Sequence, residues 1–327
     1  MRKLMKKLSL ALLFIPLISG SALAPPPEGA RPQPILSDRP SSHIELEALF
    51  SRHNYEWSTL DEGIPSIFLE GLPDDLNRIS QVDRKKAVFF LSLLPVVLRV
   101  NEEIRVQKDS LETLLERYDQ GQTLSVGERA QLTAIADEYK VDADPLSNER
   151  ARRTLLSRVD TLPASLVLAQ AATESAYGTS RFARLGNNLF GEWTFISGTG
   201  IVPRKRQSGR THEVRSFASI YESVSSYMKN INTHRAYQTL RELREEMRAE
   251  GKPLRGEDLA EGLSRYSEQG QAYVRKIKSV IRSNRLQRLT SVIFRPEAEP
   301  TETAIMTAGL FSSAQGSSRW SGSRLDP

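Results

Sequence analysis

The sequence predicts a predominantly helical α+β fold. Most segments between about residues 42 and 293 repeat apolar residues at helical spacing, and a single stretch, Ile196–Ser216, alternates around a turn as a β-hairpin does. The chain has 327 residues, of which 39% are hydrophobic. That size and composition allow one large domain or two modest ones with a real core. We therefore expect a helical body that carries one small β lobe.

The first 24 residues have the outline of a secretory signal peptide. An apolar run, Leu8–Ile18, precedes the small-residue pattern Ala22–Ala24, and the run is short for a transmembrane helix. We therefore expect export to the periplasm or cell envelope. Pro25 directly after the pattern is expected to hinder cleavage, so an uncleaved anchor that keeps the protein at the inner membrane stays open. The basic residues ahead of the apolar run are Arg2, Lys3, Lys6 and Lys7.

Composition divides the remaining chain into four parts. Residues 25–42 are proline-rich without an apolar period, which predicts an extended linker. Residues 43–147 read as a helical N-terminal region, and residues 148–293 as a second, larger domain. Residues 294–327 are poor in large apolar residues and rich in Ser, Gly, Thr and Glu, which predicts a disordered tail.

Four helical segments are expected in the N-terminal region. The longest, Val82–Gln107, is interrupted by Pro95, and its charged flanks favour a helix kinked or divided at the proline over a membrane span. Ser125 and Glu128 have the spacing of a capping box. The other expected segments are Ile44–Asn54, Asp109–Asp119 and a helix that runs from the capping box to about Tyr139.

The second domain begins with an unusually apolar helix. Thr161–Ser180 reads TLPASLVLAQAATESAYGTS; Asp160 or Thr161 can cap it, Pro163 fits its first turn, and Gly178 is a natural terminator. A helix that is apolar nearly all round is buried. The other helices expected here are Asn148–Val159, Ser219–Thr233, Gln238–Glu250, Gly256–Leu263 and Gln271–Arg285.

Glu174 is the only ionisable side chain in Thr161–Ser180 apart from the weakly acidic Tyr177. It lies in the last turn, where the buried helix emerges. A carboxyl group among apolar neighbours has a raised pKa, and an acid still protonated near neutral pH suits general acid catalysis. A cation from elsewhere in the fold, or a structural role with hydrogen bonds to backbone, is the alternative.

The motif Gly186–Gly191, GNNLFG, follows the carboxylate. Two adjacent amides offer donors and acceptors for sugar hydroxyl and acetamido groups, and aromatic rings offer flat surfaces for pyranose rings. An Asx-type loop with core aromatics is the alternative. The candidate substrate-binding residues are Tyr177, Asn187, Asn188, Phe190 and Trp193.

TESAYGTSRFARLGNNLFGEW resembles the catalytic motif of the bacterial endo-β-N-acetylglucosaminidases that cleave peptidoglycan, the glycoside hydrolase family 73 type. VFFLSLLPVVLRVNEEI and MKNINTHRAY resemble its exported Bax-like branch, so the resemblance covers about residues 82–285. It implies a lysozyme-like helical domain with a hairpin lobe across a glycan groove. It also implies that Glu174 is the general acid, that Asn187, Asn188 and Phe190 contact substrate, and that a tyrosine beyond the hairpin is functional. Tyr266 matches that tyrosine better than Tyr273 does.

The chain departs from the family in its second acidic residue. Many relatives carry one on the first hairpin strand, where this chain has the basic run VPRKRQSGR. Glu213 on the returning strand is a candidate base or nucleophile, although it also reads as an ordinary exposed strand glutamate. Without a second carboxylate, the 2-acetamido group of the substrate is the expected attacking group, which we favour.

The sequence thus predicts an exported peptidoglycan hydrolase that cuts β-1,4 glycosidic bonds next to N-acetylglucosamine. A non-catalytic wall-binding or scaffolding protein is the alternative, and lytic transglycosylase chemistry is a third possibility. The absence of cysteine excludes thiolate catalysis, and the four histidines lack metal-ligand spacing, so no cofactor or metal is expected. Export argues against a nucleic-acid partner, despite a net charge of +5. The expected partner is the glycan strand of peptidoglycan.

Overall fold

The structure, a computed structural model, describes residues 35–37, 39–204, 206, 209 and 211–296. The predicted signal peptide, most of the linker and most of the tail lie outside these residues. The chain divides into the units Met1–Arg31 and Pro32–Pro327, and every described residue belongs to the second. Within that described part, none of the helices has both the length and the apolar character that a bilayer crossing needs.

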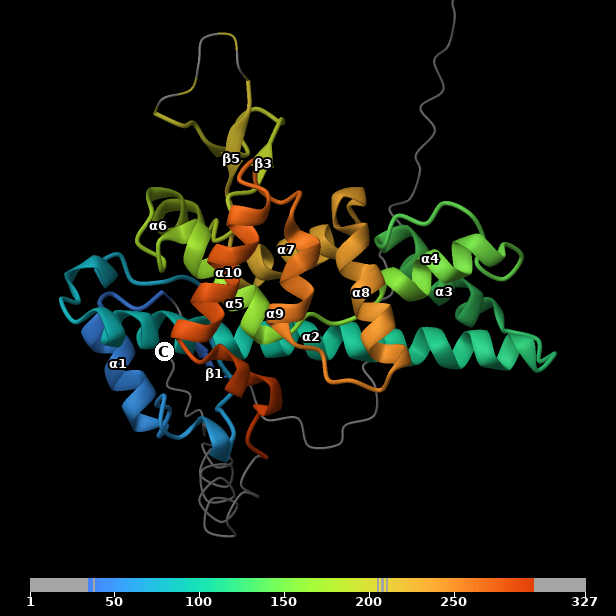
Figure 1. Cartoon of the computed structure of the whole chain (residues 1–327), viewed down its shortest axis with the longest axis horizontal. Coiled ribbons are helices and arrows are strands. Elements are labelled where there is room, and N and C mark those ends of the chain that lie inside the picture. The colour runs from blue at the N-terminus through green and yellow to red at the C-terminus, as the bar shows by residue number, and fades with distance from the viewer. Residues whose placement is uncertain (1–34, 38, 205, 207–208, 210, 297–327) are drawn as a thin grey trace, which may run out of the picture. The chain divides into compact units, whose positions relative to one another are not determined.

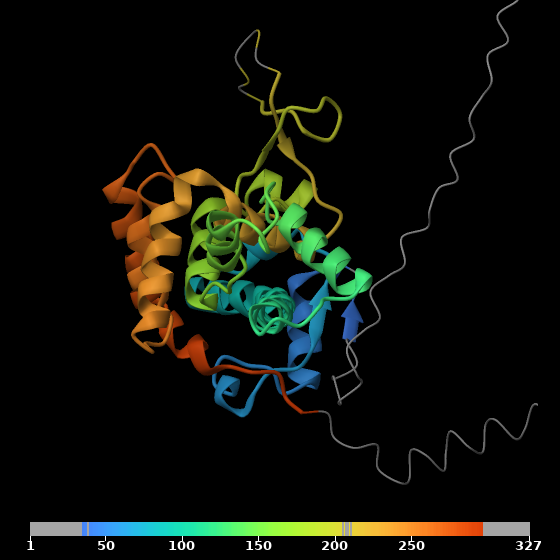
Figure 2. The ribbon, with the colours of Figure 1, turned by 90° about the vertical axis from the view of Figure 1, so that its right-hand side faces the viewer.

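The helix α2, Val82–Asp119, is the centre of the helical body. In Figure 2 it is seen end-on, with other helices around it. Of the predicted kink or division at Pro95, the division is wrong, because α2 has 38 residues and runs through the proline without interruption. Pro95 cannot donate to the carbonyl four residues earlier, at Leu91. The hydroxyl of Tyr55 donates to that carbonyl at 2.9 Å, so the buried oxygen keeps a partner.

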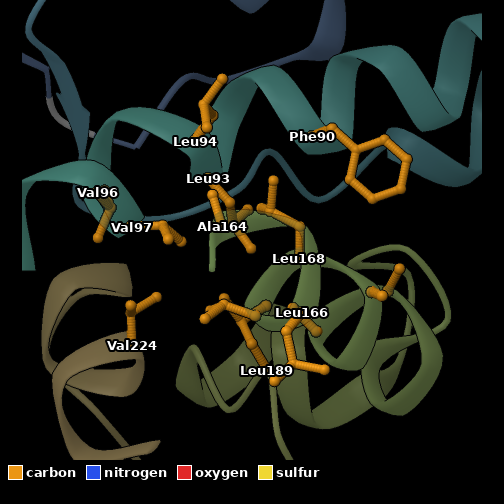
Figure 3. Packing of buried hydrophobic residues seen from close by; sticks show 14 of the residues in the cluster. Phe90, Leu93, Leu94, Val96, Val97, Ala164, Leu166, Leu168, Leu189 and Val224 are labelled. Carbon is orange, nitrogen blue, oxygen red and sulfur yellow. The ribbon is translucent and has the colours of Figure 1, made fainter. Parts of the chain in front are cut away.

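The main core forms where α2 meets α5, Ala164–Ser175, and α7, Ile220–Thr233. Every residue of α5 from Ala164 to Ala172 is buried, as predicted for a helix apolar on all sides. Asn101 on α2 bonds both backbone groups of Leu162, which fixes the start of α5 against α2. Figure 3 shows apolar side chains of the three helices meeting in this core, among them Leu93, Val97, Leu166, Leu168 and Val224.

The C-terminal half of α2 supports a second, smaller core. It packs with α3, Val126–Glu138, and α4, Glu149–Arg158, around Leu115, Leu132 and Leu155. The predicted capping box of Ser125 and Glu128 is confirmed at the start of α3. The other N-terminal elements are α1 (His43–Arg52) and the short 3-10 helices η1 (Leu60–Glu62) and η2 (Leu76–Arg78).

Three of the remaining helices pack on α5. α10 packs directly on α5, and α9 and η5 also contact it. α8 and α10 lie close to predicted segments, and the predicted Gly256–Leu263 divides into an α-helical and a 3-10 turn, whereas α6, η3 and η5 were not predicted. The bounds are α6 (Arg181–Gly186), η3 (Arg235–Tyr237), α8 (Gln238–Ala249), α9 (Gly256–Leu259), η4 (Ala260–Leu263), α10 (Gln271–Ser283) and η5 (Leu286–Ser291).

A β lobe projects from the helical body on the side away from α1 (Figures 1 and 2). Its strands are β3 (Trp193–Thr194), β4 (Gly200–Ile201) and β5 (Glu213–Arg215), in the antiparallel order β3-β5-β4. The predicted hairpin is the β4–β5 pair, and β3 adds a strand that the sequence did not predict. Most of the predicted turn lies outside the described residues. The predominantly helical α+β fold class is confirmed.

Both ends of the described chain are more ordered than the sequence predicts. β1, Ile35–Ser37, lies in the predicted linker and pairs in parallel with β2, Ile67–Leu69. Arg39 donates to the carbonyl of Arg184 at 2.9 Å. In the predicted tail, Arg295 donates a backbone bond of 2.8 Å to Ile64. The folded body therefore extends beyond both predicted limits.

Asp160, at the start of the apolar helix, is the centre of a buried polar cluster. Arg248 and Lys108 approach its carboxylate at 2.9 and 3.0 Å, and the buried Arg244 lies at 3.8 Å. Arg244 also donates to the carbonyl of Asp160 at 3.0 Å. Burial alone would raise the pKa of Asp160, but the three cations together outweigh it, so the pKa is lowered. This cluster ties α2 and α8 to the start of α5.

Candidate active site

Three consecutive left-handed residues end α5. Ala176, Tyr177 and Gly178 have φ values of 51°, 56° and 76°. The helix therefore ends before Gly178, the predicted terminator. A Cβ on Gly178 would lie 2.5 Å from Leu72, so only glycine fits there. Left-handed conformations cost non-glycine residues roughly 1–2 kcal/mol each, and such strain is concentrated at functional sites.

Glu174 lies half-buried directly before this turn, and a chain of side-chain hydrogen bonds leads away from it. The Tyr273 hydroxyl donates to Glu174 Oε1 at 2.8 Å. Gln170, one turn earlier on α5, donates from Nε2 to the same hydroxyl at 3.0 Å. The Tyr227 hydroxyl in turn donates to Gln170 Oε1. Groups from α5, α7 and α10 therefore fix the orientation of the Glu174 carboxyl group.

Burial raises the pKa of Glu174, as the sequence predicts. The Tyr273 hydrogen bond and the charge of Lys276 act in the opposite direction, but burial outweighs them. Burial and the neighbouring Glu174 raise the pKa of Tyr273, so this residue stays a hydroxyl donor. Among the described residues, the Glu174 side chain has no hydrogen bond to backbone. The structural alternative for Glu174 requires hydrogen bonds to backbone, and the described residues provide none.

Stacked aromatic rings lie beside this chain. Phe190 stacks on Tyr227 with ring centroids 3.9 Å apart, and Tyr266 stacks on Tyr273 at 5.2 Å. The Tyr266 hydroxyl donates to the backbone carbonyl of Phe190 at 3.0 Å. Tyr266, the tyrosine that the sequence favoured, thus contacts Phe190 and Tyr273. Tyr273 is the one that contacts Glu174. The functional role predicted for Tyr266 stays a prediction.

The side-chain amides of Asn187 and Asn188 both donate hydrogen bonds to backbone carbonyls. Asn187 donates to the carbonyls of Phe217 and Ala218, both at 3.2 Å, and accepts from Arg39 at 3.0 Å. Asn188 donates to two carbonyls, Glu192 O at 2.8 Å and Arg215 O at 2.7 Å. Its Oδ1 also accepts from the Glu192 amide at 3.0 Å. These bonds join the GNNLFG loop to β5 and the residues after it. The predicted sugar contact of Asn187 and Asn188 stays a prediction.

Glu213 is buried, with 6% exposure, and is not the solvated strand residue that the sequence predicts. Its carboxylate accepts from the Gly198 amide at 3.1 Å and from the Gly200 amide at 2.9 Å. The β3–β4 loop folds over the carboxylate, so Glu213 organises the lobe. It has no contact with the hydrogen-bonded chain around Glu174 in the described part of the molecule.

The two other aromatic candidates differ in exposure. Trp193 on β3 is 59% exposed and stacks on His212, with centroids 4.3 Å apart. Tyr177 packs edge-on against Phe89 and Phe90 at 5.8 Å. Trp193 therefore offers a flat, accessible ring on the β lobe, and Tyr177 is anchored to α2.

Sequence reasoning missed Gln170 and Glu192 and underrated Tyr273. Gln170 is the one polar residue a full turn before Glu174 in an apolar helix, a signal that was available. Glu192 directly follows GNNLFG. Burial raises the pKa of Glu192, against a 2.8 Å hydrogen bond from Ser226 and the charge of Arg215. Its Oε1 is buried without a partner among the described residues.

Burial raises the pKa of Tyr237 to about 12, and the charges of Glu192 and Glu174 add to this effect. Both carboxyl groups therefore act on one tyrosine of η3. For metals, the part of the chain that the structure describes holds no cluster of three histidine, aspartate or glutamate side chains.

Comparisons with known proteins identify the family of this chain. The glucosaminidase family, described as mannosyl-glycoprotein endo-beta-N-acetylglucosaminidase, matches residues 151–286. Protein bax of Escherichia coli K12 is 36% identical over 202 residues, which cover 62% of this chain and 70% of that protein. The chain belongs to the Bax-like branch of the glucosaminidase family. It is thus a member of a glycoside hydrolase family of the peptidoglycan-hydrolase type.

The catalytic domain of the autolysin Auto from Listeria monocytogenes also aligns with the structure. The alignment covers 53% of this chain and 95% of that domain, at 18% identity and a TM-score of 0.30. This likeness is too weak to add to the assignment.

The matched family segment contains Glu174 and every side chain hydrogen-bonded to it or to Gln170.

Proposed function

We propose that this protein is an exported peptidoglycan hydrolase that cleaves β-1,4 glycosidic bonds next to N-acetylglucosamine, with Glu174 as the general acid. The observation that carries the proposal is the half-buried Glu174 carboxyl, whose pKa burial raises and whose orientation Tyr273 fixes. Family membership supplies the class of reaction. The predicted signal segment and the cell-wall substrate together favour action in the cell envelope.

In this mechanism, Glu174 gives its proton to the glycosidic oxygen as the bond to the anomeric carbon breaks. The carboxylate left behind keeps the hydrogen bond from Tyr273 and the nearby charge of Lys276. Both interactions favour the charged form, so they are strongest once the proton has left. Gln170 holds the Tyr273 hydroxyl in place during that change.

The second catalytic group has two candidates, Glu213 and the 2-acetamido group of the substrate. Glu213 is engaged with the amides of Gly198 and Gly200, which favours a role in shaping the lobe over that of a base. We therefore favour attack by the 2-acetamido group of the substrate, followed by water. A thiazoline that mimics the cyclised sugar should then inhibit strongly, since it resembles the charged intermediate.

Trp193 is the best placed sugar-binding aromatic. It is exposed on the β lobe, and its stacking on His212 holds the ring in one orientation. Phe190 is buried in a stack with Tyr227, so it supports the site from within. Tyr177 lies three residues after Glu174, in the left-handed turn that ends α5, and is a second candidate for the groove wall.

Mass spectrometry of purified peptidoglycan after digestion tests the proposal. Products with reducing N-acetylglucosamine ends support it. Anhydro-muramic ends would instead indicate lytic transglycosylase chemistry, and products with reducing muramic ends would contradict the proposed bond. No products at all, with retained binding to peptidoglycan, would favour the non-catalytic alternative.

A further inference from the structure

A polar cavity of about 360 Å³ lies between the N-terminal part of α2 and the end of α10. Its wall is formed by Trp57, Asp83, Lys86, Ala87, Phe90, Ser283, Asn284 and Arg285. Trp57 and Lys86 come from outside the segment 151–286 that matches the family. The cavity is therefore built jointly by the N-terminal helical region and the predicted catalytic domain.

Arg285 is the most unusual residue of this wall. It follows α10 with a φ of 52°, in a left-handed conformation that glycine or asparagine adopts at lower cost. Its side chain is exposed and has no hydrogen bond or ion pair among the described residues. A left-handed residue is common directly after a helix, so the conformation by itself assigns no role. The exposed guanidinium, without a partner among the described residues, is the feature that leaves Arg285 free to bind a ligand. An arginine here presents planar donors that suit a carboxylate.

Lys86 adds a second cation to the wall. Its ammonium lies 3.7 Å from the carboxylate of Asp83, which is fully exposed and therefore binds it weakly. The Trp57 ring is half-buried, and the Asn284 amide brings further hydrogen-bonding groups. The two cations outnumber the one carboxylate of the wall, Asp83, whose side chain is fully exposed. Together with an aromatic face, an amide and a hydroxyl, this excess positive charge suits a sugar that carries a carboxylate.

Two routes connect the cavity with Glu174. Along α10, Ser283 lies two turns from Lys276, the residue whose charge acts on Glu174, which is about 10 Å at 1.5 Å per residue. Along the other route, the Lys86 ammonium lies 6.0 Å from the centroid of the Tyr177 ring, three residues beyond Glu174. The wall of the cavity therefore reaches Tyr177, in the turn that follows the end of α5 with the proposed acid.

We propose that this cavity is an accessory subsite that binds the acidic, peptide-bearing amino sugar of a peptidoglycan strand, with Arg285 and Lys86 pairing its carboxylates. The proposal rests on the proposed function, because it extends the same substrate groove onto the N-terminal region. It assigns that region a part in choosing peptide-substituted glycan over uncharged glycan. The chemistry of the wall predicts little contribution to the binding of neutral N-acetylglucosamine oligomers.

Calorimetric binding to the full chain tests the subsite. The Glu174→Gln protein is titrated with a GlcNAc–MurNAc tetrapeptide and, separately, with neutral triacetylchitotriose, so that no turnover occurs. Arg285→Gly and Lys86→Gln are added singly to this background. Arg285→Gly removes the guanidinium and relieves the left-handed strain, so it should not lower the melting temperature. Arg129→Ala, an exposed arginine on α3, is the charge-matched control.

Each subsite variant should weaken binding of the tetrapeptide ligand about tenfold, as loss of a charged hydrogen bond does, and leave chitotriose binding unchanged. The control should bind both ligands like the parent. Parental affinity for the tetrapeptide ligand in both subsite variants would overturn the subsite, even if wild-type protein digests peptidoglycan. Equal weakening for both ligands would contradict a carboxylate site. A wild-type protein that neither binds nor cuts peptidoglycan would remove the proposed function, and the subsite with it.

Discussion

Replacing Tyr273 with phenylalanine should shift the pH dependence of hydrolysis. The Tyr273 hydroxyl donates to Glu174 at 2.8 Å, and this bond stabilises the carboxylate against the effect of burial. A hydrogen bond to a charged group contributes about 1.5–3 kcal/mol, and the lower end applies because Glu174 is only half-buried. About 1.5 kcal/mol is roughly tenfold in the equilibrium between acid and carboxylate.

Without that bond, the pKa of Glu174 rises further. Activity that needs the protonated acid then persists to higher pH, so the basic limb of the kcat/KM profile moves upward. The assay is the rate of reducing-end release from purified peptidoglycan between pH 4 and 9. Tyr266→Phe is the matched control, because its hydroxyl bonds the carbonyl of Phe190 and has no hydrogen bond to Glu174. A basic limb that stays in place or moves downward in Tyr273→Phe would refute the role of this hydrogen bond.

Three further predictions concern residues that hold the site together. Asn188→Ala removes three hydrogen bonds to backbone and should lower the free energy of unfolding in urea by about 1–3 kcal/mol; a parental midpoint would contradict the structural role. Glu213→Gln should loosen the β3–β4 loop, which is measured as faster amide exchange there, and should reduce activity only mildly. A rate loss as deep as that of Glu174→Gln would instead make Glu213 catalytic. Asp160 has a lowered pKa, so its stabilisation is present above the unfolded-state value near 3.8 and is lost as pH falls through the folded value. Asp160→Asn should lower the free energy of unfolding at pH 7 by about 3–5 kcal/mol, since Arg244 stays buried without its charged partner. Below pH 4, a further fall in pH should change the melting temperature of the variant less than that of wild type.

The helices and Glu174 were predictable because their signals are local. The apolar run of α5 and the isolated carboxylate lie within twenty residues of sequence. The capping box of α3 also lies within four residues. Patterns of this range report burial and helix limits directly.

The contacts that complete the site depend on residues far apart in sequence. Tyr273 reaches Glu174 across 99 positions, so no local pattern singles it out over Tyr266. Pro95 predicted a kink or a division of α2, but the helix continues, and Tyr55, 36 positions from Leu91, donates to the carbonyl that the proline cannot bond. Glu213 reads as an exposed strand residue because the residues that cover it, Gly198 and Gly200, lie 15 and 13 positions earlier in the sequence. In each case tertiary packing overrides the local signal.

The central claim is that Glu174 donates the proton that breaks the glycosidic bond. The most direct measurement is the rate of peptidoglycan cleavage by Glu174→Gln beside wild type at the optimum pH, with both melting temperatures recorded. The amide keeps the size of the side chain but has no acidic proton to give, so we expect a loss of about 10²–10⁴-fold. The melting temperature at pH 7 should not fall, because the raised pKa means that the buried carboxylate opposes folding above its unfolded-state pKa. A variant that cleaves at the wild-type rate would contradict the claim.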